Sequence, residues 1–477
     1  MSCSAKEECG IIALSEPEAA APGAAAREAF YGLFALQHRG QEAAGIATAD
    51  GHAVTLRKGL GLVTQIFGAA EIAGLPGRLA IGHTRYSTTG ASSIRNAQPF
   101  YLETKHGPIA LAHNGNLINA GELRGELLER GVGLSTSSDS EVMIMMLAAA
   151  KGATWPERIA ACMERWVGAF SFVVLTADAV YAARDPWGFR PLCAGKLPRG
   201  GSAAASESSA LRTLGSNDPR DLEPGSIVEL RPDGAVQVGS VRLPASNPKA
   251  AEAACVFEYV YFSRPDSEWR GISVREARRR FGAALAAEAP AEADIVIAVP
   301  DSSISAAIGY SQASGIPYDE GFVKNRYIGR TFIEPTEALR QKGVALKFNV
   351  MPSAVKGRRI VMVDDSIVRG NTTGPLVRLL RDAGAAAVHV RISSPPIRYP
   401  CYMGVDMGSR DELIASRLTA AEICRKVGAD SLAYLSLEAM LAAAGGSGLC
   451  SACFSGSYPC GPCSAVRKDS FECGQCV

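Results

Sequence analysis

Two short apolar runs in the second half of the chain end in acidic residues, and they constrain the fold more than any other feature. Residues 293–300 (ADIVIAVP) are followed by Asp301, and residues 358–363 (RRIVMV) are followed by Asp364 and Asp365. Each run continues into a loop of small residues and then into a helical pattern. Uninterrupted apolar strands that alternate with helices are typical of a parallel sheet covered on both faces. The chain after about Cys255 is therefore predicted to form an α/β domain.

The first half of the chain has a different pattern of short strands and turns. Its apolar or alternating runs, bounded by Gly, Asn, Asp or Ser, are CGIIAL, AGIATA, LAIGHTRY, IALAHNG and SFVVLT. Helical patterns interrupt them at about residues 29–36 and 140–150. Such a mixture predicts an α+β domain built on packed sheets. The 477 residues favour two domains, and the stretch 244–254, rich in Pro, Ala, Asn and Lys, is the predicted linker.

The composition narrows the class of protein and its compartment. A formal net charge of +1 argues against a general nucleic-acid binder, and no apolar run reaches the roughly 18 residues of a membrane span. The start, MSCSAKEECG, resembles neither a secretory signal nor a transit peptide, so we expect a cytoplasmic protein without membrane or nucleic-acid partners. Disulfides are rare in the cytoplasm. The thirteen cysteines, six of them in three C-x-x-C pairs after residue 449, therefore favour metal or iron–sulfur ligation.

Five polar motifs follow one another through the first half of the chain. They are CGII (9–12), QHRGQE (37–42), HTRYST (83–88), HNGN (113–116) and SSDSE (137–141). Taken singly, a cysteine that opens an apolar strand is usually a core residue, and an Arg or Asp is usually part of a surface ion pair. Together and in this order, the motifs resemble those of the N-terminal-nucleophile (Ntn) glutamine amidotransferases, whose fold has αββα layers.

That resemblance implies the chemistry of the first half. Cys9 is the expected nucleophile, and its own α-amino group, with an ordinary pKa near 8, is the expected base. Cys9 must then become the first residue, so residues 1–8 are an expected propeptide. The Asn114 side-chain amide and the Gly115 backbone N–H would form the oxyanion hole.

The same resemblance implies three residues that bind glutamine itself. A bidentate guanidinium suits the α-carboxylate of the substrate, and a carboxylate suits its α-ammonium group. The expected residues are Arg85 for the α-carboxylate, Asp139 for the α-ammonium group and Thr88 as an assisting hydroxyl.

A second constellation lies where the apolar run at residues 359–364 ends. Two adjacent carboxylates precede a loop of small hydroxyl residues and Gly, and this loop leads into a helical pattern. The segment resembles the signature of the type I phosphoribosyltransferases. The resemblance implies that the carboxylates engage the ribose hydroxyls and a Mg²⁺ ion, and that N–H groups at the helix N-terminus bind the 5′-phosphate. The expected ligands of phosphoribosyl pyrophosphate here are Asp364, Asp365, Ser366, Arg369, Gly370, Asn371, Thr372 and Thr373.

Two further segments fit this second resemblance. Ser302 follows the other apolar run and stands at the family's metal position, beside Asp364 and Asp365. The basic stretch that begins at Lys324 and includes Arg330 resembles the family's mobile loop, whose closure over pyrophosphate would exclude water. The rival phosphate-binding patterns, G-x-x-x-x-G-K-[ST] and G-x-G-x-x-G/A, are missing from these strand–loop–helix junctions.

The two signatures, in this order in one chain, resemble the amidophosphoribosyltransferase family, in its branch with an iron–sulfur cluster and a propeptide. The resemblance implies a propeptide at 1–8, an Ntn domain at 9–243, a type I phosphoribosyltransferase domain at 255–442 and a Cys-rich tail at 443–477. It implies glutamine-dependent amination of phosphoribosyl pyrophosphate to 5-phosphoribosylamine, with ammonia passing through a dry interior route. It also implies one Mg²⁺ and one 4Fe–4S cluster per subunit, purine-nucleotide inhibitors and a homotetramer.

Four cysteines stand in contexts that resemble those of the cluster ligands in that branch. They are Cys255, Cys401, Cys450 and Cys453. Four thiolates are the usual ligand set, and we expect a structural cluster because neither half-reaction transfers electrons. Four later cysteines match nothing in the family and could bind zinc, compete for the cluster or be idle: Cys460, Cys463, Cys473 and Cys476.

Two other functions fit part of the sequence. Non-catalytic regulators with a phosphoribosyltransferase fold need neither Cys9 nor the Asn114–Gly115 pair, and they usually carry a DNA-binding module. Glucosamine-phosphate synthase shares the amidotransferase half, but its second half is a sugar-isomerase domain. The signature at 363–373 argues against such a domain in this chain. A glutaminase assay with and without phosphoribosyl pyrophosphate separates these functions.

Overall fold

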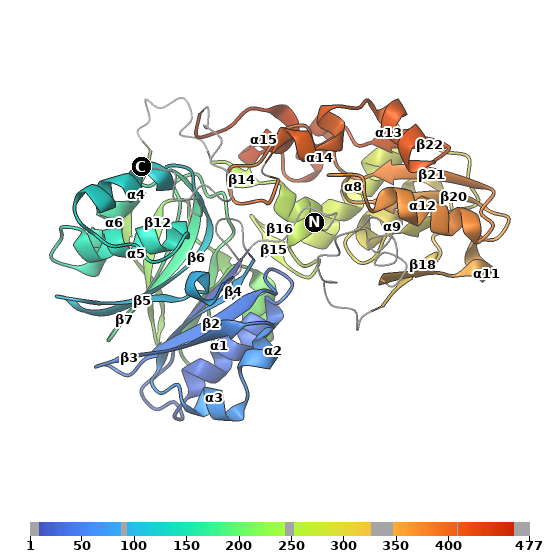
Figure 1. Cartoon of the computed structure of the whole chain (residues 1–477). Helices are drawn as coiled ribbons and strands as arrows, with labels where there is room; N and C mark the ends of the chain where they lie inside the picture. The colour runs from blue at the N-terminus through green and yellow to red at the C-terminus, as the bar shows by residue number, and fades with distance from the viewer. Residues whose placement is uncertain (1–8, 87–92, 244–251, 326–346, 408, 462–477) are drawn as a thin grey trace.

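The computed structural model describes residues 9–86, 93–243, 252–325, 347–407 and 409–461, which form two domains (Figure 1). No helix within these ranges has the length and apolarity that a bilayer span requires. Several predictions concern residues outside the described ranges. They are the propeptide at 1–8, Thr88, the linker residues 244–251, Arg330, and the tail cysteines Cys463, Cys473 and Cys476.

The first domain contains a seven-stranded antiparallel sheet with the order β11-β9-β10-β1-β4-β2-β3. In its centre β1 pairs with β4, and Gly10 lies opposite Thr84. This register places the residue before β1 beside the end of β4. The strands are β1 (Gly10–Ser15), β2 (Ala43–Ala49), β3 (Val54–Leu60), β4 (Leu79–Arg85), β9 (Cys193–Lys196), β10 (Ser202–Ala205) and β11 (Arg220–Asp221).

A second antiparallel sheet of the same domain has the order β13-β12-β8-β7-β6-β5. Its strands are β5 (Phe100–Thr104), β6 (Gly107–Leu117), β7 (Gly168–Thr176), β8 (Val180–Arg184), β12 (Ser226–Arg231) and β13 (Gly234–Ser240). Small and branched residues of the two sheets, such as Ala13, Ala47, Ala110 and Val173, share one buried cluster. The sheets therefore pack face to face with short side chains between them.

Helices cover the outer face of each sheet, which confirms the predicted αββα layers (Figure 1). The first sheet is covered mainly by α1 (Ala24–Ala35) and α7 (Ser208–Thr213), with α2 (Val63–Ile66) and α3 (Ala69–Ala73) nearby. The second sheet is covered by α4 (Ala120–Glu129), α5 (Asp139–Ala149) and α6 (Trp155–Met163). Both predicted helices of this half, at 29–36 and 140–150, correspond to α1 and α5.

The second domain has a four-stranded parallel sheet with the order β17-β20-β21-β22, as the apolar runs predicted. Alternate residues of each strand face opposite sides, and both sides are covered by helices, so the runs are apolar throughout. The strands are β17 (Ile295–Ala298), β20 (Arg359–Asp364), β21 (Ala387–Ile392) and β22 (Ser431–Tyr434). The helices are α8 (Val274–Glu288) and α9 (Ile304–Ser314) on one face and α12 (Thr373–Asp382) and α13 (Ala420–Val427) on the other.

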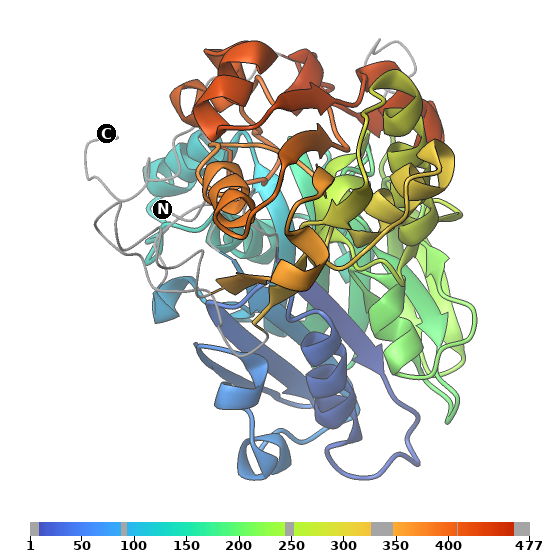
Figure 2. The ribbon, with the colours of Figure 1, turned by 90° about the vertical axis from the view of Figure 1, so that its right-hand side faces the viewer.

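Part of the C-terminal tail is built into the start of the second domain. The strand β14 (Ala254–Cys255) pairs in parallel with β23 (Leu449–Cys450). Figure 2 shows the described end of the tail in red at the top of the molecule, far from the blue strands β1 to β4 of the first sheet. Residues Ala253 and Ala254 are buried in this structure, so the predicted linker ends earlier than residue 254. The remaining elements are β15 (Glu268–Trp269), β16 (Ile272–Ser273), β18 (Phe322–Lys324), β19 (Phe348–Val350), α11 (Pro352–Val355), α14 (Leu437–Ala443), α15 (Ala452–Ser455), the π-helical turn η2 (Glu258–Phe262), and the 3₁₀ turns η1 (Ile94–Asn96), η3 (Arg410–Glu412) and η4 (Ile414–Ser416).

Candidate active sites

Cys9 lies directly before β1, at the centre of the first sheet, and its side chain is buried. Its thiol donates to the carbonyl oxygen of Tyr86 at 3.3 Å. Burial raises the pKa of the Cys9 thiol to about 11. The thiol is therefore protonated near neutral pH and needs a base before it can act as a nucleophile.

The two charged residues predicted to hold glutamine lie near this thiol. Arg85 is the buried last residue of β4. Asp139 is the first residue of α5, and its carboxylate accepts a hydrogen bond from the backbone N–H of Leu117 at 3.1 Å. Burial has the largest effect on the pKa of Cys9. The charge of Arg85 lowers this pKa, and the charge of Asp139 raises it. The fold thus brings a cation and a carboxylate within electrostatic reach of Cys9, as recognition of a zwitterionic amino acid requires.

The predicted oxyanion hole lies on β6. Both polar side-chain atoms of Asn114 are buried and have no hydrogen-bond partner among the residues that the structure describes. The carbonyl oxygen of the preceding His113 lies 3.1 Å from Nε2 of His83, which holds this part of β6 against β4. Gly115 has a φ of +146°, and a Cβ there would lie 1.9 Å from the carbonyl oxygen of Ala169. A buried amide without a partner is costly, and this amide is available to donate to a ligand.

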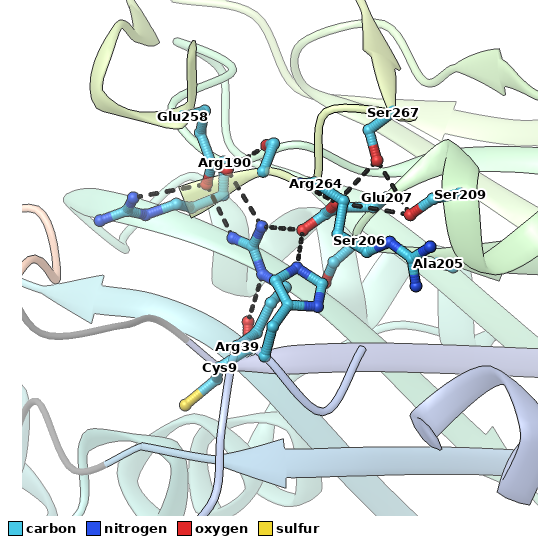
Figure 3. Close-up of polar contacts among 12 residues, drawn as sticks. Cys9, Arg39, Arg190, Ala205, Ser206, Glu207, Ser209, Glu258, Arg264 and Ser267 are labelled. Atoms are coloured by element: carbon cyan, nitrogen blue, oxygen red, sulfur yellow. Dashed lines mark hydrogen bonds and ion pairs between the residues drawn. The ribbon is translucent and has the colours of Figure 1, made fainter. Parts of the chain in front are cut away.

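Arg39 contacts the backbone of Cys9, and no role was predicted for it although the motif at 37–42 contains it. The Nε of its fully buried side chain donates to the carbonyl oxygen of Cys9 at 3.1 Å. Its two terminal nitrogens lie 2.7 Å from carboxylate oxygens of Glu207 and Glu258 (Figure 3). Glu258 belongs to the second domain and is 219 residues away along the chain. Nothing in the local sequence signals a contact at that separation.

The second candidate site lies at the carboxyl end of β20. Asp364 and Asp365 are each only 7% exposed. Ser303 donates to Asp364 at 3.2 Å, while Ser302 and Ser366 donate to Asp365. Burial and the neighbouring Asp365 raise the pKa of Asp364 well above its usual value, and burial also raises the pKa of Asp365. Two buried carboxylates whose side-chain partners are hydroxyl groups are suited to a divalent cation.

The loop after these carboxylates leads into the N-terminus of α12, as predicted. Gly370 has a φ of +76°, a conformation that favours glycine. The loop ends at Thr372, and α12 begins at Thr373. The first N–H groups of this ten-residue helix point toward the loop, where a phosphate would bind. Arg369 forms an ion pair with Glu412, so its predicted role in binding substrate requires that this pair rearrange.

Two predicted residues of this site come from a different part of the sheet. Ser302 follows β17, and Lys324 at the end of β18 lies 2.5 Å from the carboxylate of the neighbouring Asp301. The structure therefore brings Ser302 into contact with the acidic pair and Lys324 into contact with Asp301, the residue before Ser302. Arg278, for which no role was predicted, lowers the pKa of Asp365 through its charge, against the larger effect of burial.

The four cysteines predicted to hold a cluster also lie together. Cys255 and Cys450 are register partners in the β14–β23 pair. The carbonyl oxygen of Cys453 accepts from the backbone N–H groups of residues 398 and 399, just before Cys401. Each of the four thiols lies within electrostatic reach of another. Within the described ranges no three His, Cys, Asp or Glu side chains converge as they do around a single metal ion. Cys460 is partly buried and packs beside the same apolar cluster as Cys450.

Known proteins share this arrangement along almost the whole chain. Residues 83–213 match the family model of a glutamine amidotransferase domain. The chain is 49% identical to amidophosphoribosyltransferase from Synechococcus elongatus over 462 residues, which cover 95% of this chain and 92% of that protein. It is also 49% identical to amidophosphoribosyltransferase from Archaeoglobus fulgidus over 459 residues, with coverage of 94% and 98%.

A solved structure extends the similarity from sequence to three dimensions. Glutamine phosphoribosylpyrophosphate amidotransferase from B. subtilis, complexed with ADP and GMP, is 43% identical and gives a TM-score of 0.85. The match covers 94% of this chain and 97% of that chain, so it includes both domains. Because identity and coverage are this high, the chain belongs to the amidophosphoribosyltransferase family.

Proposed function

We propose that this chain catalyses the glutamine-dependent amination of 5-phosphoribosyl 1-pyrophosphate to 5-phosphoribosylamine, the first step of purine synthesis. The observation that carries the proposal is that each domain buries a polar group at a free-energy cost that a ligand would relieve. The first is the unpartnered Asn114 amide, and the second is the Asp364–Asp365 carboxylate pair. Each is costly in the folded protein and becomes favourable when a ligand binds. A non-catalytic sensor would need only the second site, and a glucosamine-phosphate synthase only the first.

In the first domain the nucleophile is Cys9 and the base is its own α-amino group. The amine takes the thiol proton, and the sulfur attacks the side-chain amide carbon of glutamine. The resulting oxyanion accepts hydrogen bonds from the Asn114 amide and the Gly115 N–H. Collapse of this intermediate releases ammonia and leaves a thioester, which water hydrolyses to glutamate and free Cys9. Arg85 and Asp139 hold the charged end of glutamine, and Thr88 assists.

This mechanism requires that residues 1–8 be removed. The Cys9 nitrogen is part of a peptide bond in the full chain, and an amide nitrogen cannot act as the base. With a thiol pKa near 11, the uncut chain has little thiolate at neutral pH. We therefore expect the intact mass of active protein to begin at Cys9.

In the second domain ammonia replaces pyrophosphate at the anomeric carbon of the ribose. The N–H groups at the start of α12, with Ser366, Gly370, Asn371, Thr372 and Thr373, bind the 5′-phosphate, and Asp364 and Asp365 orient the ribose hydroxyls. The positive charges of Lys324 and Arg330 stabilise the departing pyrophosphate. Ammonia reaches this site by a dry interior route, and closure of the basic loop that begins at Lys324 keeps water from the activated ribose.

The acidic pair fits one Mg²⁺ per subunit. Asp364, Asp365 and Ser302 would hold the ion, and these oxygen donors are of the type that it prefers. When bound, it supplies positive charge that stabilises the departing pyrophosphate.

The four neighbouring thiols fit one 4Fe–4S cluster per subunit. Cys255, Cys401, Cys450 and Cys453 are partly or fully buried and come from three separate segments. A cluster is larger than one ion, so its ligands need not converge as closely as those of a single metal. When bound, it would join the tail to the start of the second domain. Protein purified without oxygen should be brown, and serine at any one of these four positions should remove the iron.

The tail cysteines provide the control for this ligand set. Replacement of Cys460, Cys463, Cys473 and Cys476 together by Ser should leave the iron content unchanged. Loss of iron in that variant, with iron retained in Cys450→Ser, would show that the tail supplies the ligands. Zinc in place of iron in every preparation, the wild type included, would contradict the cluster itself.

Two properties of relatives extend the proposal to regulation and assembly. The B. subtilis enzyme was solved with ADP and GMP, and we expect purine nucleotides to inhibit this chain. We also expect a cytoplasmic homotetramer. Light scattering with and without these nucleotides measures the assembly.

One experiment tests the proposed function directly. Phosphoribosylamine formation is measured with glutamine and, separately, with ammonium chloride as the nitrogen source. Cys9→Ala should abolish the glutamine-dependent reaction and keep the ammonia-dependent one, because the two sites are separate. Glutamine-dependent product from Cys9→Ala would refute the nucleophile, and product from neither source in the wild type would refute the function.

A further inference from the structure

We propose that Glu258 of the second domain positions the nucleophile of the first domain, acting through Arg39. The inference rests on the proposed function, because that function makes Cys9 the reacting residue. It adds a positioning residue from outside the glutaminase domain. The glutaminase site is then complete only when the second domain is in place.

Cys9 needs an anchor because it is the end of the mature chain. The first strand begins only at Gly10, so the ladder of the sheet does not include Cys9 itself. Terminal residues fray unless another group ties them down. The Nε of Arg39 donates to the carbonyl oxygen of Cys9 at 3.1 Å, in a fully buried position. This hydrogen bond fixes the backbone of the one residue that carries both the nucleophile and its base.

Arg39 is itself held from two sides, one in each domain. Glu207 of the first domain and Glu258 of the second each place a carboxylate oxygen 2.7 Å from it, and both side chains are at most 1% exposed. Burial alone would lower the pKa of Arg39, but Glu258 and Glu207 raise it above its usual value. Glu258 contacts both terminal nitrogens, so it sets the plane of the guanidinium group (Figure 3).

Glu258 is fixed in turn by the second domain. Ser263 donates to its carboxylate at 2.6 Å. The buried side chain of Arg278 donates to three carbonyl oxygens of the same turn, those of Tyr259, Tyr261 and Ser263. The position of the Arg39 guanidinium therefore depends on a hydrogen-bonded turn of the second domain.

The surrounding contacts show that this is not an isolated ion pair. Arg190 of the first domain lies 3.9 Å from Glu258 and also donates to the carbonyl oxygen of Met403, in the second domain. His38 lies 2.7 Å from Glu207. Loss of Glu258 would leave Arg39 with Glu207 as a partner, so the guanidinium would stay buried but lose one of the two carboxylates that orient it. A misplacement of about 1 Å at a reacting group can lower a rate by about a hundredfold.

The test compares two carboxylates that cross the domain boundary. Glu258→Gln keeps the shape of the side chain and removes its charge. Glu268→Gln is the matched control, since Glu268 also belongs to the second domain and pairs with Arg212 of the first, but in an exposed position away from Cys9. Both variants are assayed as the full chain with glutamine and with ammonia, over a range of glutamine concentrations.

We expect Glu258→Gln to lower kcat for the glutamine-dependent reaction by about 10- to 100-fold, with little change in KM for glutamine. The ammonia-dependent rate should stay within about twofold, and Glu268→Gln should match the wild type in both assays. An unchanged glutamine-dependent rate, or an equal loss with both nitrogen sources, would overturn the proposal. Either result leaves the nucleophile assignment intact if Cys9→Ala still loses only the glutamine-dependent reaction.

Two more variants separate positioning from general damage. The double variant of Arg39→Gln and Glu258→Gln should be no slower with glutamine than Arg39→Gln alone, because both changes remove the same contact to Cys9. Additive losses would contradict a shared pathway. If Glu258→Gln does not fold, Arg39→Lys provides the test. Lysine keeps the positive charge but lacks the guanidinium nitrogens that contact Cys9 and both carboxylates. Full glutamine-dependent activity in Arg39→Lys would overturn the proposal.

Discussion

The two domains bury negative charge in opposite ways. At the back of the glutaminase site, Glu207 and Glu258 are fully buried, but arginine side chains contact both of them. At the phosphoribosyltransferase site, Asp364 and Asp365 are buried beside each other, and their contacts come from serine hydroxyls and a backbone N–H.

The pKa values follow this difference. Although burial opposes it, His38 and Arg39 hold the pKa of Glu207 well below its usual value. Burial and Asp365 raise the pKa of Asp364 well above its usual value. Charge that the protein neutralises by a direct ion pair holds residues in place. Buried carboxylates that no described cation contacts directly mark a place where a ligand supplies positive charge.

The largest expected effect is at the acidic pair. Replacement of both Asp364 and Asp365 by Asn should lower amination from either nitrogen source by at least about a thousandfold, because the charge that binds the cation and orients the ribose is lost. Calorimetry should show that Mg²⁺-dependent binding of phosphoribosyl pyrophosphate is lost too. Asp294→Asn is the control and should bind normally, because Asp294 precedes β17 and pairs with Arg359 at the start of β20, the end of the strand opposite the acidic pair. Undiminished binding by the double variant would refute this site.

A somewhat smaller effect is expected at the oxyanion hole. Asn114→Ala should lower kcat with glutamine by about 10²- to 10³-fold, as the loss of one oxyanion donor does in other acyl-transfer enzymes. The ammonia-dependent rate should not change. The neighbouring Asn116→Ala is a useful contrast, because that amide already donates to the carbonyl oxygen of Tyr402 and should affect stability rather than rate. Equal rates for Asn114→Ala and wild type would remove Asn114 from the mechanism.

The contrast between the two sites also predicts that Glu258→Gln and Asp365→Asn change the stability of the substrate-free protein in opposite directions. Glu258→Gln should lower the free energy of unfolding by about 1–3 kcal/mol, because it weakens a buried, charge-assisted contact. Asp365→Asn should not lower it and should raise the melting temperature measured in EDTA, because it relieves the repulsion on Asp364. Calorimetric melting of both variants checks the signs. A lower melting temperature for Asp365→Asn would mean that its serine contacts outweigh the repulsion.

The smallest effect is expected for the exposed ion pair between the domains. Arg212 and Glu268 lie 3.1 Å apart with 42% and 50% of their side chains exposed. Such pairs contribute about 0–1 kcal/mol, so Glu268→Gln should change the free energy of unfolding by no more than that, and less at high salt. Denaturant titration at two salt concentrations measures it. A cost comparable to that of Glu258→Gln would show that burial is not what separates the two pairs.

The local patterns of the sequence predicted much of what the structure shows. The apolar runs that end in Asp301 and Asp364 predicted parallel strands with loops at their carboxyl ends, and β17 and β20 confirm them. The motifs around Cys9, Asn114 and Asp139 predicted which residues gather in the first domain. These features could be predicted because the strand period, the turn residues and the motif spacing depend on residues that are close together in the chain.

The tertiary structure alone decided how the sites are held. The sheet order places Cys9 beside the end of β4, and the meeting of two domains places Glu258 on Arg39, 219 residues away. Likewise, Arg278 acts on the acidic pair while its hydrogen bonds go to backbone carbonyls, which have no signature in a sequence. Local patterns reflect which residues of a segment are buried or exposed and how they contact their neighbours in the chain. Contacts between distant segments depend on which surfaces the folded chain brings together, and that is settled only when the two domains pack.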